Sequence, residues 1–264
     1  MRVLLIFIRL AYQQAAIYRF EFWVRIGGVF IMMYGMLSLW KTLSTQGVQL
    51  GGGIPLEQMP TYGTINIIIF SLLSAAYSIR HYVAGQVRSG KLELDLLKPV
   101  NFINFMLLRN FGEFMTGLLV TGIPGLVFAI FVLKVQLPAQ PINALLFVLS
   151  LLLAYLIFFA FNLLVGMVSI ITLNISSYTW AIDALVSFAS GMVVPLTLFP
   201  DKLKALLYLL PFYNLYQSPL QIYLGSAHNI YQVLAIQLLW VVVLFLCAHL
   251  AWRIMDKKVQ IQGG

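Results

Sequence analysis

The side chains that could carry out catalysis or bind a metal are few and far apart in this chain. The three histidines, His81, His228 and His249, fall in three separate segments, and no HExxH or comparable metal-ligand spacing is present. The single cysteine, Cys247, excludes a disulfide framework and a cysteine-based metal site within the chain. The sequence also lacks GxxxxGK[ST], the phosphate-binding loop of nucleotide-binding proteins. We therefore predict no catalytic residue, no metal and no cofactor bound by this chain.

A few polar side chains lie inside long apolar stretches and are candidates for a role in function. Asp183 is the only ionisable residue well inside such a stretch, where an ionisable group marks a candidate functional site by default. Asn66 and Asn162 are also notable, because an amide without a partner is costly in hydrocarbon. We place all three on a possible substrate path. The alternative for Asp183 is a local role near the membrane surface, with Tyr178 or Asn174 as its partner.

The elements that must position these side chains are membrane-spanning helices. Between Lys134 and Asp183 lie 48 residues without an Asp, Glu, Lys, Arg or His. A helix needs about 20 apolar residues to cross a bilayer, so this run has room for two crossings. A soluble protein would have to hide both helices, and 264 residues cannot build enough shell around them. The chain is therefore predicted to be a polytopic membrane protein.

The overall composition supports the same conclusion. The chain is 61% hydrophobic and 9% charged, against about 25% charged residues in an ordinary globular domain. Sixteen Lys and Arg against eight Asp and Glu give a net charge of +8. In a membrane protein this excess indicates topology, because basic residues are retained on the cytoplasmic side. Nucleic acid is accordingly not predicted as a partner.

The apolar pattern predicts six spans, over residues 22–40, 59–79, 105–133, 142–172, 178–199 and 230–252. An even number of spans places both termini on one side of the membrane. If that side is the cytoplasm, only Lys41, Lys134, Lys202 and Lys204 remain outside. The basic residues that collect inside are Arg2, Arg9, Arg19, Arg25, Arg80, Arg88, Lys91, Lys98, Arg109, Arg253, Lys257 and Lys258. This bias predicts that both termini are cytoplasmic.

Two segments outside the spans complete the predicted fold. Residues 1–18 carry Arg2, Arg9 and Gln13 on one narrow stripe, which favours a helix lying along the headgroups; the alternative is a ragged start to the first span. Residues 200–229 are too apolar for an ordinary loop and predict two short helices that form a re-entrant or interfacial hairpin. The expected fold is all-α: a single transmembrane domain over residues 1–264 with an interfacial helix, six transmembrane helices and a hairpin before the last span.

The predicted cytoplasmic loop, residues 81–104, is dense in charge yet rich in leucine. Lys91 and Asp95 are spaced as a helical ion pair, and Leu92 and Leu96 would form an apolar stripe beside them. Pro99 predicts that this helix ends at the preceding residue. Leucine at every second position also fits a strand, but an isolated strand would leave its edges unpaired. A short exposed amphipathic helix favours a protein partner, and the alternative is a solvated loop resting on the headgroups.

This loop resembles a stretch found in a known family. Its sequence R-S-G-K-L-E-L-D-L-L-K-P-V-N is similar to the G-x-[LI]-E-x-L-L-x-x-P-V stretch of permease subunits of type-2 ABC exporters. The form L-L-K-P-V-N resembles a bacterial subfamily, and the resemblance extends over nearly the whole chain. Asp95 within the motif, and Asn101 and Asn104 after it, depart from the broader family pattern. The residues that the resemblance places in the coupling segment are Ser89, Gly90, Leu92, Glu93, Leu96, Leu97 and Pro99.

The resemblance implies a specific assembly and location. Residues 89–98 would be a coupling helix that docks into a cleft of a separate ATPase subunit, which binds ATP and Mg²⁺. Two ABC ATPase subunits and two permease copies, identical or paralogous, would form the transporter in the bacterial inner membrane among its lipids. The hairpin at residues 200–229 would help to close the extracellular gate.

The expected function is export of a hydrophobic or amphipathic substrate from the cytoplasm. Arg109 and Glu113, one turn apart at the start of the third span, are predicted to transmit motion as a linked pair; the alternative is a local ion pair. Two other functions stay open at this point: a membrane scaffold that transports nothing, and an ion-coupled secondary transporter. The second is weakened because only one deep carboxylate is present and no inverted repeat is evident.

Overall fold

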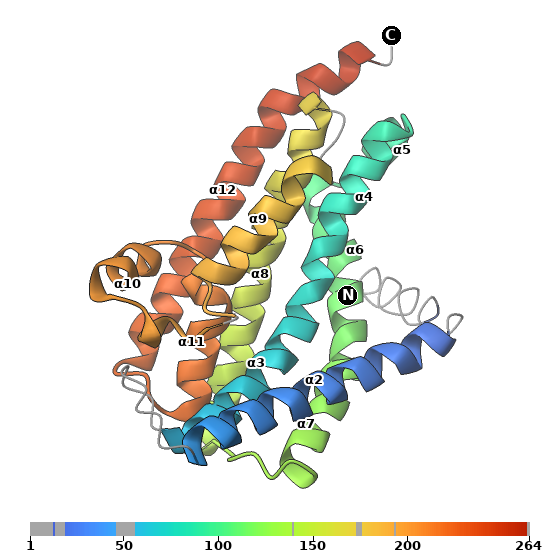
Figure 1. Cartoon of the computed structure of the whole chain (residues 1–264). Helices are drawn as coiled ribbons and strands as arrows, with labels where there is room; N and C mark the ends of the chain where they lie inside the picture. The colour runs from blue at the N-terminus through green and yellow to red at the C-terminus, as the bar shows by residue number, and fades with distance from the viewer. Residues whose placement is uncertain are drawn as a thin grey trace.

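The computed structural model describes residues 13, 19–45, 56–138, 140–172, 176–192 and 194–262, and within these ranges the secondary structure is helical with no strand (Figure 1). The predicted interfacial helix at residues 1–18 lies almost entirely outside the described residues. The helical elements are α2 (Arg19–Thr45), η1 (Leu56–Gln58), α3 (Met59–Leu73), η2 (Ser74–Ala76), α4 (Tyr77–Arg88), α5 (Leu92–Leu96), α6 (Phe102–Gly117), η3 (Leu118–Gly122), α7 (Ile123–Phe131), α8 (Pro141–Thr172), α9 (Ser176–Ala189), η4 (Leu196–Leu198), α10 (Asp201–Tyr208), α11 (Tyr213–Leu224) and α12 (Ile230–Gln262).

Five stretches of helix within the described residues are long and apolar enough to cross a membrane. They are Trp23–Leu43, Met59–Arg88, Phe102–Phe131, Pro141–Thr172 and Ile230–Met255. Each matches one of the predicted spans. The second continues as helix to Arg88, so the loop that follows starts later than residue 81, where the sequence placed it. The chain is a multi-pass membrane protein.

The predicted span at residues 178–199 is not one continuous helix. Helix α9 is 14 residues long and ends at Ala189. Gly191 then adopts a left-handed backbone with φ of 74°, a conformation that glycine enters without steric cost. Its carbonyl and that of Met192 lack helical partners, and α3 supplies them: Tyr62 Oη donates to Gly191 O at 3.1 Å, and Asn66 Nδ2 donates to Met192 O at 2.7 Å. The number of spans beyond five therefore stays a prediction.

Helix α8 forms the centre of the bundle, with α4, α11 and α12 packed against it (Figure 1). Its aromatic residues Tyr155, Phe158 and Phe159 are fully buried. Gly166 allows α4 to approach closely, because a Cβ at this position would lie 2.9 Å from the Arg80 Cα. Small residues at helix crossings allow such backbone approach inside membranes.

The residues between α9 and α12 form two short helices, α10 and α11, as the sequence predicted. Pro219 lies inside α11. Helix α11 is largely buried and packs against α8, α3 and α12, so it is part of the bundle. The re-entrant placement of this hairpin stays a prediction.

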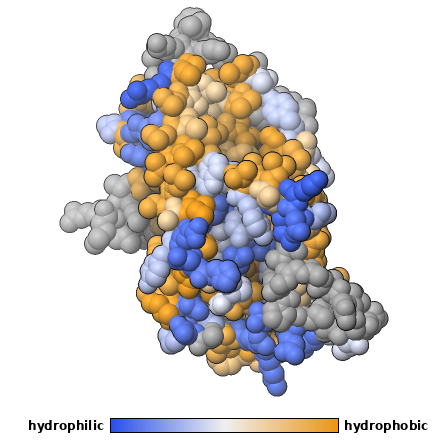
Figure 2. Space-filling model, turned by 90° about the vertical axis from the view of Figure 1, so that its left-hand side faces the viewer, coloured by the Kyte–Doolittle hydropathy of each residue, from blue (hydrophilic) through white to orange (hydrophobic). Residues whose placement is uncertain are grey.

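The outer surface is apolar over much of the bundle. In Figure 2 the side of the molecule on which α10 and α12 lie in Figure 1 faces the viewer, and hydrophobic surface covers much of its upper half. Soluble monomers rarely expose continuous apolar patches of this extent. On α12 the exposed hydrophobic residues include Leu238, Leu239, Val242, Leu246, Leu250 and Ile254. This surface is suited to lipid.

Candidate functional site

The segment that the sequence singled out projects from one end of the bundle, between α4 and α6 (Figure 1). Helix α4 ends in a Schellman motif: Lys91 N–H donates to Gln86 O at 2.9 Å and Gly90 N–H donates to Val87 O at 3.1 Å. Gly90 takes the left-handed conformation that this motif requires, with φ of 66°. The chain turns sharply here, and α5 follows directly.

Replacing Gly90 with alanine is expected to destabilise this turn by about 1–2 kcal/mol, because an L-residue is strained in the left-handed region. A Cβ at this position would meet nothing within 4 Å, so the cost is conformational and not steric. Asparagine tolerates the same backbone better and is expected to cost less than alanine. Denaturant titration in detergent would measure both variants. An alanine variant at least as stable as the asparagine variant would contradict this account.

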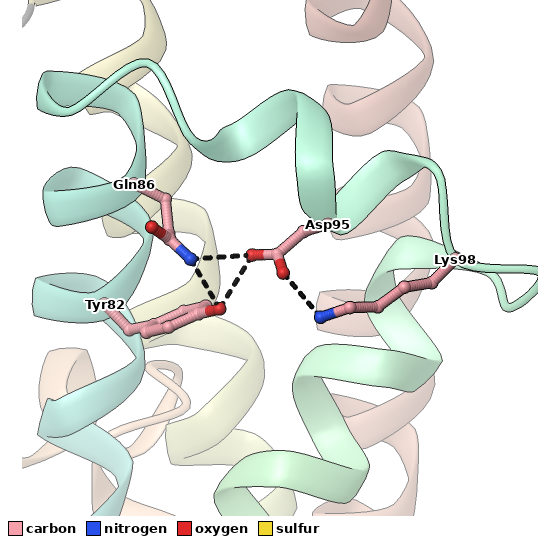
Figure 3. Close-up of polar contacts among 4 residues, drawn as sticks. All are labelled: Tyr82, Gln86, Asp95 and Lys98. Atoms are coloured by element: carbon pink, nitrogen blue, oxygen red, sulfur yellow. Dashed lines mark hydrogen bonds and ion pairs between the residues drawn. The ribbon is translucent and has the colours of Figure 1, made fainter.

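Helix α5 is held by one buried carboxylate. Asp95 is 4% exposed, and its Oδ2 accepts hydrogen bonds from Tyr82 Oη at 2.7 Å and from Gln86 Nε2 at 3.1 Å (Figure 3). Its Oδ1 pairs with Lys98 Nζ at 2.7 Å. The predicted ion pair between Lys91 and Asp95 is wrong, because Asp95 faces α4 and pairs with Lys98, which follows α5. This inward orientation also gives a role to the acidic side chain at position 95, where the sequence departs from the broader family pattern.

Contacts with α6 extend this cluster. The Arg109 guanidinium lies over the Tyr82 ring at 3.8 Å, and Lys98 Nζ lies over the Phe105 ring at 3.9 Å. Cations over aromatic faces are attracted by the ring quadrupole. In the described part of the chain no ion pair within 4.0 Å joins Arg109 to Glu113, although the two charges attract at longer range. The direct contact of Arg109 is with Tyr82 of α4, and a role for Arg109 and Glu113 in transmission stays a prediction.

The leucines of the segment divide between the two sides of α5. Leu92 is 4% exposed and belongs to the main core, and Leu96 packs partly against that core. Leu94 and Leu97 are 60% and 80% exposed. Sequence reasoning favoured Leu92 and Leu96 as the partner-facing stripe, whereas the structure turns them inward.

The other predicted coupling residues lie around this exposed face. Ser89 caps the end of α4, and Glu93 and Pro99 are exposed on either side of the leucines. Asn101 begins α6, where its side-chain oxygen accepts from Ile103 N–H at 3.0 Å and Asn104 N–H at 3.4 Å. This is an ordinary N-cap, so Asn101 is explained by the start of α6.

The two asparagines of the predicted substrate path are used within the protein. Asn66 donates to the carbonyl of Met192, as described above. Asn162 is fully buried in α8 and donates to Phe158 O at 2.9 Å, one turn earlier in its own helix. The side-chain oxygens of both lack a partner. The structure therefore gives both residues a local bonding role, and their place on a substrate path stays a prediction.

Asp183 has a strong partner that sequence reasoning missed. The Arg80 guanidinium of α4 binds its carboxylate with two parallel contacts, Nη1 to Oδ1 at 2.7 Å and Nη2 to Oδ2 at 2.6 Å. Arg80 is buried and also lies 4.8 Å from the centre of the Tyr77 ring. Neither Tyr178 nor residue 174 is needed to satisfy Asp183. The pair links α9 to α4, and the Arg80 guanidinium compensates the negative charge of Asp183.

Among the residues that the structure describes, no three His, Cys, Asp or Glu side chains are grouped so that they could hold a metal ion. The site at α5 thus offers a fixed projection with an exposed apolar face and no reactive group. Such a site is suited to contact with another protein.

Comparison with known families places the chain in a class of membrane transport subunits. The family model described as ABC-2 family transporter protein matches residues 30–263. Because this match covers most of the chain, the protein belongs to the ABC-2 family of transmembrane ABC transporter subunits. Membership implies association with an ABC ATPase. A search of curated proteins finds no match.

Proposed function

We propose that the chain is the permease of an ATP-driven exporter and that α5 is the element that docks on its ATPase. The observation that carries this proposal is the exposed face formed by Leu94 and Leu97, on a helix anchored to the end of the bundle by Asp95 and Leu92. An apolar face at a helix surface is a common recognition element for a groove in a partner protein. Family membership supplies the class of partner.

The remaining features of the proposed transporter follow from the sequence and the family resemblance. Two ABC ATPase subunits bind ATP and Mg²⁺, and the permease pairs with a second copy, identical or paralogous. The assembly lies in the bacterial inner membrane with both termini and α5 in the cytoplasm. ATP-driven closure of the ATPases displaces α5, and a hydrophobic or amphipathic substrate leaves the cytoplasm. The aromatic-rich interior of the bundle, which includes Tyr155, Phe158 and Phe159, supports this substrate class.

The test is co-purification of the permease with its ATPase after Leu94→Asp and Leu97→Asp, singly and together. An unpaired carboxylate buried at an apolar interface is expected to weaken binding by more than about tenfold, since tenfold corresponds to only ~1.4 kcal/mol. Turnover of the assembled ATPase should be lost in parallel. Leu209→Asp is the matched control, because Leu209 is equally exposed but lies after α10, remote from α5 in sequence.

The outcomes separate the proposed functions. Unchanged binding and turnover in the Leu94→Asp Leu97→Asp variant would overturn the docking role of α5. Stable binding of an ATPase whose turnover never depends on the permease would favour a scaffold. Leu92→Asp is unsuitable as a docking test, because Leu92 lies in the core and its replacement would unfold the anchor of α5.

A further inference from the structure

One buried carboxylate connects α5 to α4 and to the segment between α5 and α6. Asp95 of α5 accepts from Tyr82 and Gln86, both on α4, and pairs with Lys98, which lies between α5 and α6 (Figure 3). Gln86 Nε2 also donates to Tyr82 Oη at 2.7 Å, so each of the three groups Tyr82 Oη, Gln86 Nε2 and Asp95 Oδ2 is hydrogen-bonded to the other two. Charge-assisted hydrogen bonds of this kind are stronger and more directional than neutral ones.

Helix α5 depends on such contacts for its orientation. It has five residues, and an isolated helix of this length is unstable in water. Two side chains turn inward to hold it: Leu92, which packs in the core, and Asp95. An apolar contact such as that of Leu92 is non-directional, whereas the three donors around Asp95 define a single orientation. Asp95 therefore determines which way Leu94 and Leu97 face.

The same cluster reaches the span on the far side of α5. Arg109 of α6 lies over the ring of Tyr82, and Lys98 lies over the ring of Phe105, also of α6. A displacement of α5 thus acts on α4 through Tyr82 and Gln86, and on α6 through Lys98 and Arg109.

From this geometry we infer that Asp95 is a positioning residue for coupling, which joins α5 to α4 and α6 so that the three move as one unit when the exposed leucines are displaced. This inference rests on the proposed function, in which an ATPase displaces α5. It assigns the step after docking to one carboxylate and its donors. Leu94 and Leu97 receive the motion, and Asp95 delivers it to the two spans.

The experiment uses the full permease assembled with its ATPase. Cys247→Ser first removes the native thiol. His81→Cys on α4 and Ile254→Cys on α12 then provide two exposed cysteines for spin labels. The distance between the labels is measured without nucleotide and with ATP and vanadate. The variants are Asp95→Asn, which removes the charge, and Tyr82→Phe, which removes one donor and leaves the other two. Asp201→Asn is the matched control, because Asp201 also pairs with a lysine three residues later but is 98% exposed.

The expected result is a nucleotide-dependent distance change in the parent and in Asp201→Asn, a smaller change in Tyr82→Phe, and loss of the change in Asp95→Asn. Both site variants should still bind the ATPase, since Leu94 and Leu97 are intact and two of the three donors around position 95 still have an acceptor that holds the orientation of α5. Retention of the full distance change in Tyr82→Phe and Asp95→Asn, or its absence in the parent, would overturn the inference. The proposed function fails separately, if Leu94→Asp and Leu97→Asp leave ATPase binding unchanged.

Discussion

Replacing Asp183 with alanine is expected to lower the free energy of unfolding by about 3–5 kcal/mol, because it leaves the Arg80 charge buried and unpaired. Arg80 lies inside the bundle, and both of its terminal nitrogens contact the Asp183 carboxylate at 2.6–2.7 Å. Its Nε atom already lacks a partner, so no other group of the described protein is bonded there to take over the charge. Removal of one partner is costly even where the intact pair adds little net stability.

The measurement is unfolding in a mixture of detergents of increasing denaturing strength. Asp201→Ala is the control, since its exposed ion pair with Lys204 is expected to contribute at most about 1 kcal/mol. The double variant Arg80→Met Asp183→Leu is expected to regain much of the loss, because apolar replacement of an ion pair with a buried partner is often neutral, and here Arg80 is buried while Asp183 is partly exposed. Equal stabilities for Asp183→Ala and Asp201→Ala would show that the pair does not hold α9 to α4.

Replacing Gly166 with alanine is expected to cost about 3 kcal/mol, the upper end of the usual range for overpacking. The new Cβ would lie 2.9 Å from the Arg80 Cα and 3.4 Å from the Arg80 carbonyl oxygen. These are backbone atoms, so α4 and α8 must separate to admit one methyl group. The change would also displace Arg80 from Asp183.

The same unfolding assay tests this prediction, with Gly35→Ala as the control. Gly35 lies in α2 with nothing within 4 Å of an added Cβ, so alanine there should be neutral or stabilise the helix by about 1 kcal/mol. Equal stabilities of Gly166→Ala and Gly35→Ala would contradict the close approach of α4 and α8 at Gly166.

The sequence predicts long helices well because each depends on its own composition. The five stretches long enough to span appear where apolar runs indicated them, and the two short helices before α12 were also expected. The end of α9 was missed, because the carbonyls after it are bonded by Tyr62 and Asn66, which are more than 120 residues earlier in the chain. No local pattern contains such a partner.

For the candidate site, too, features set by local sequence were predicted and features set by distant partners were missed. Pro99 indicated that a short helix ends just before it, and α5 ends at Leu96. The face that each leucine presents was not predictable, because a five-residue helix has too few turns to define a stripe. Asp95 decides the orientation by bonding to Tyr82, and the sequence offers no sign that this tyrosine points toward it.

Arg80 was placed at the membrane edge by charge counting and was not considered as a partner for Asp183, 103 residues away. Gly166 was overlooked as well. A single glycine within a helix of 32 residues is a usable signal, because glycine weakens a helix by about 1 kcal/mol and is retained where another backbone approaches.

The break after Ala189 has a consequence for mutational screens of this transporter. The carbonyl oxygens of Gly191 and Met192 would lack hydrogen-bond donors in hydrocarbon without Tyr62 and Asn66. Substitution of Tyr62 or Asn66 therefore impairs folding, whatever its effect on substrate binding. A screen that scores transport alone would assign both residues to the translocation route. Only a parallel measure of folded protein at the membrane would separate a lost scaffold contact from a lost cargo contact.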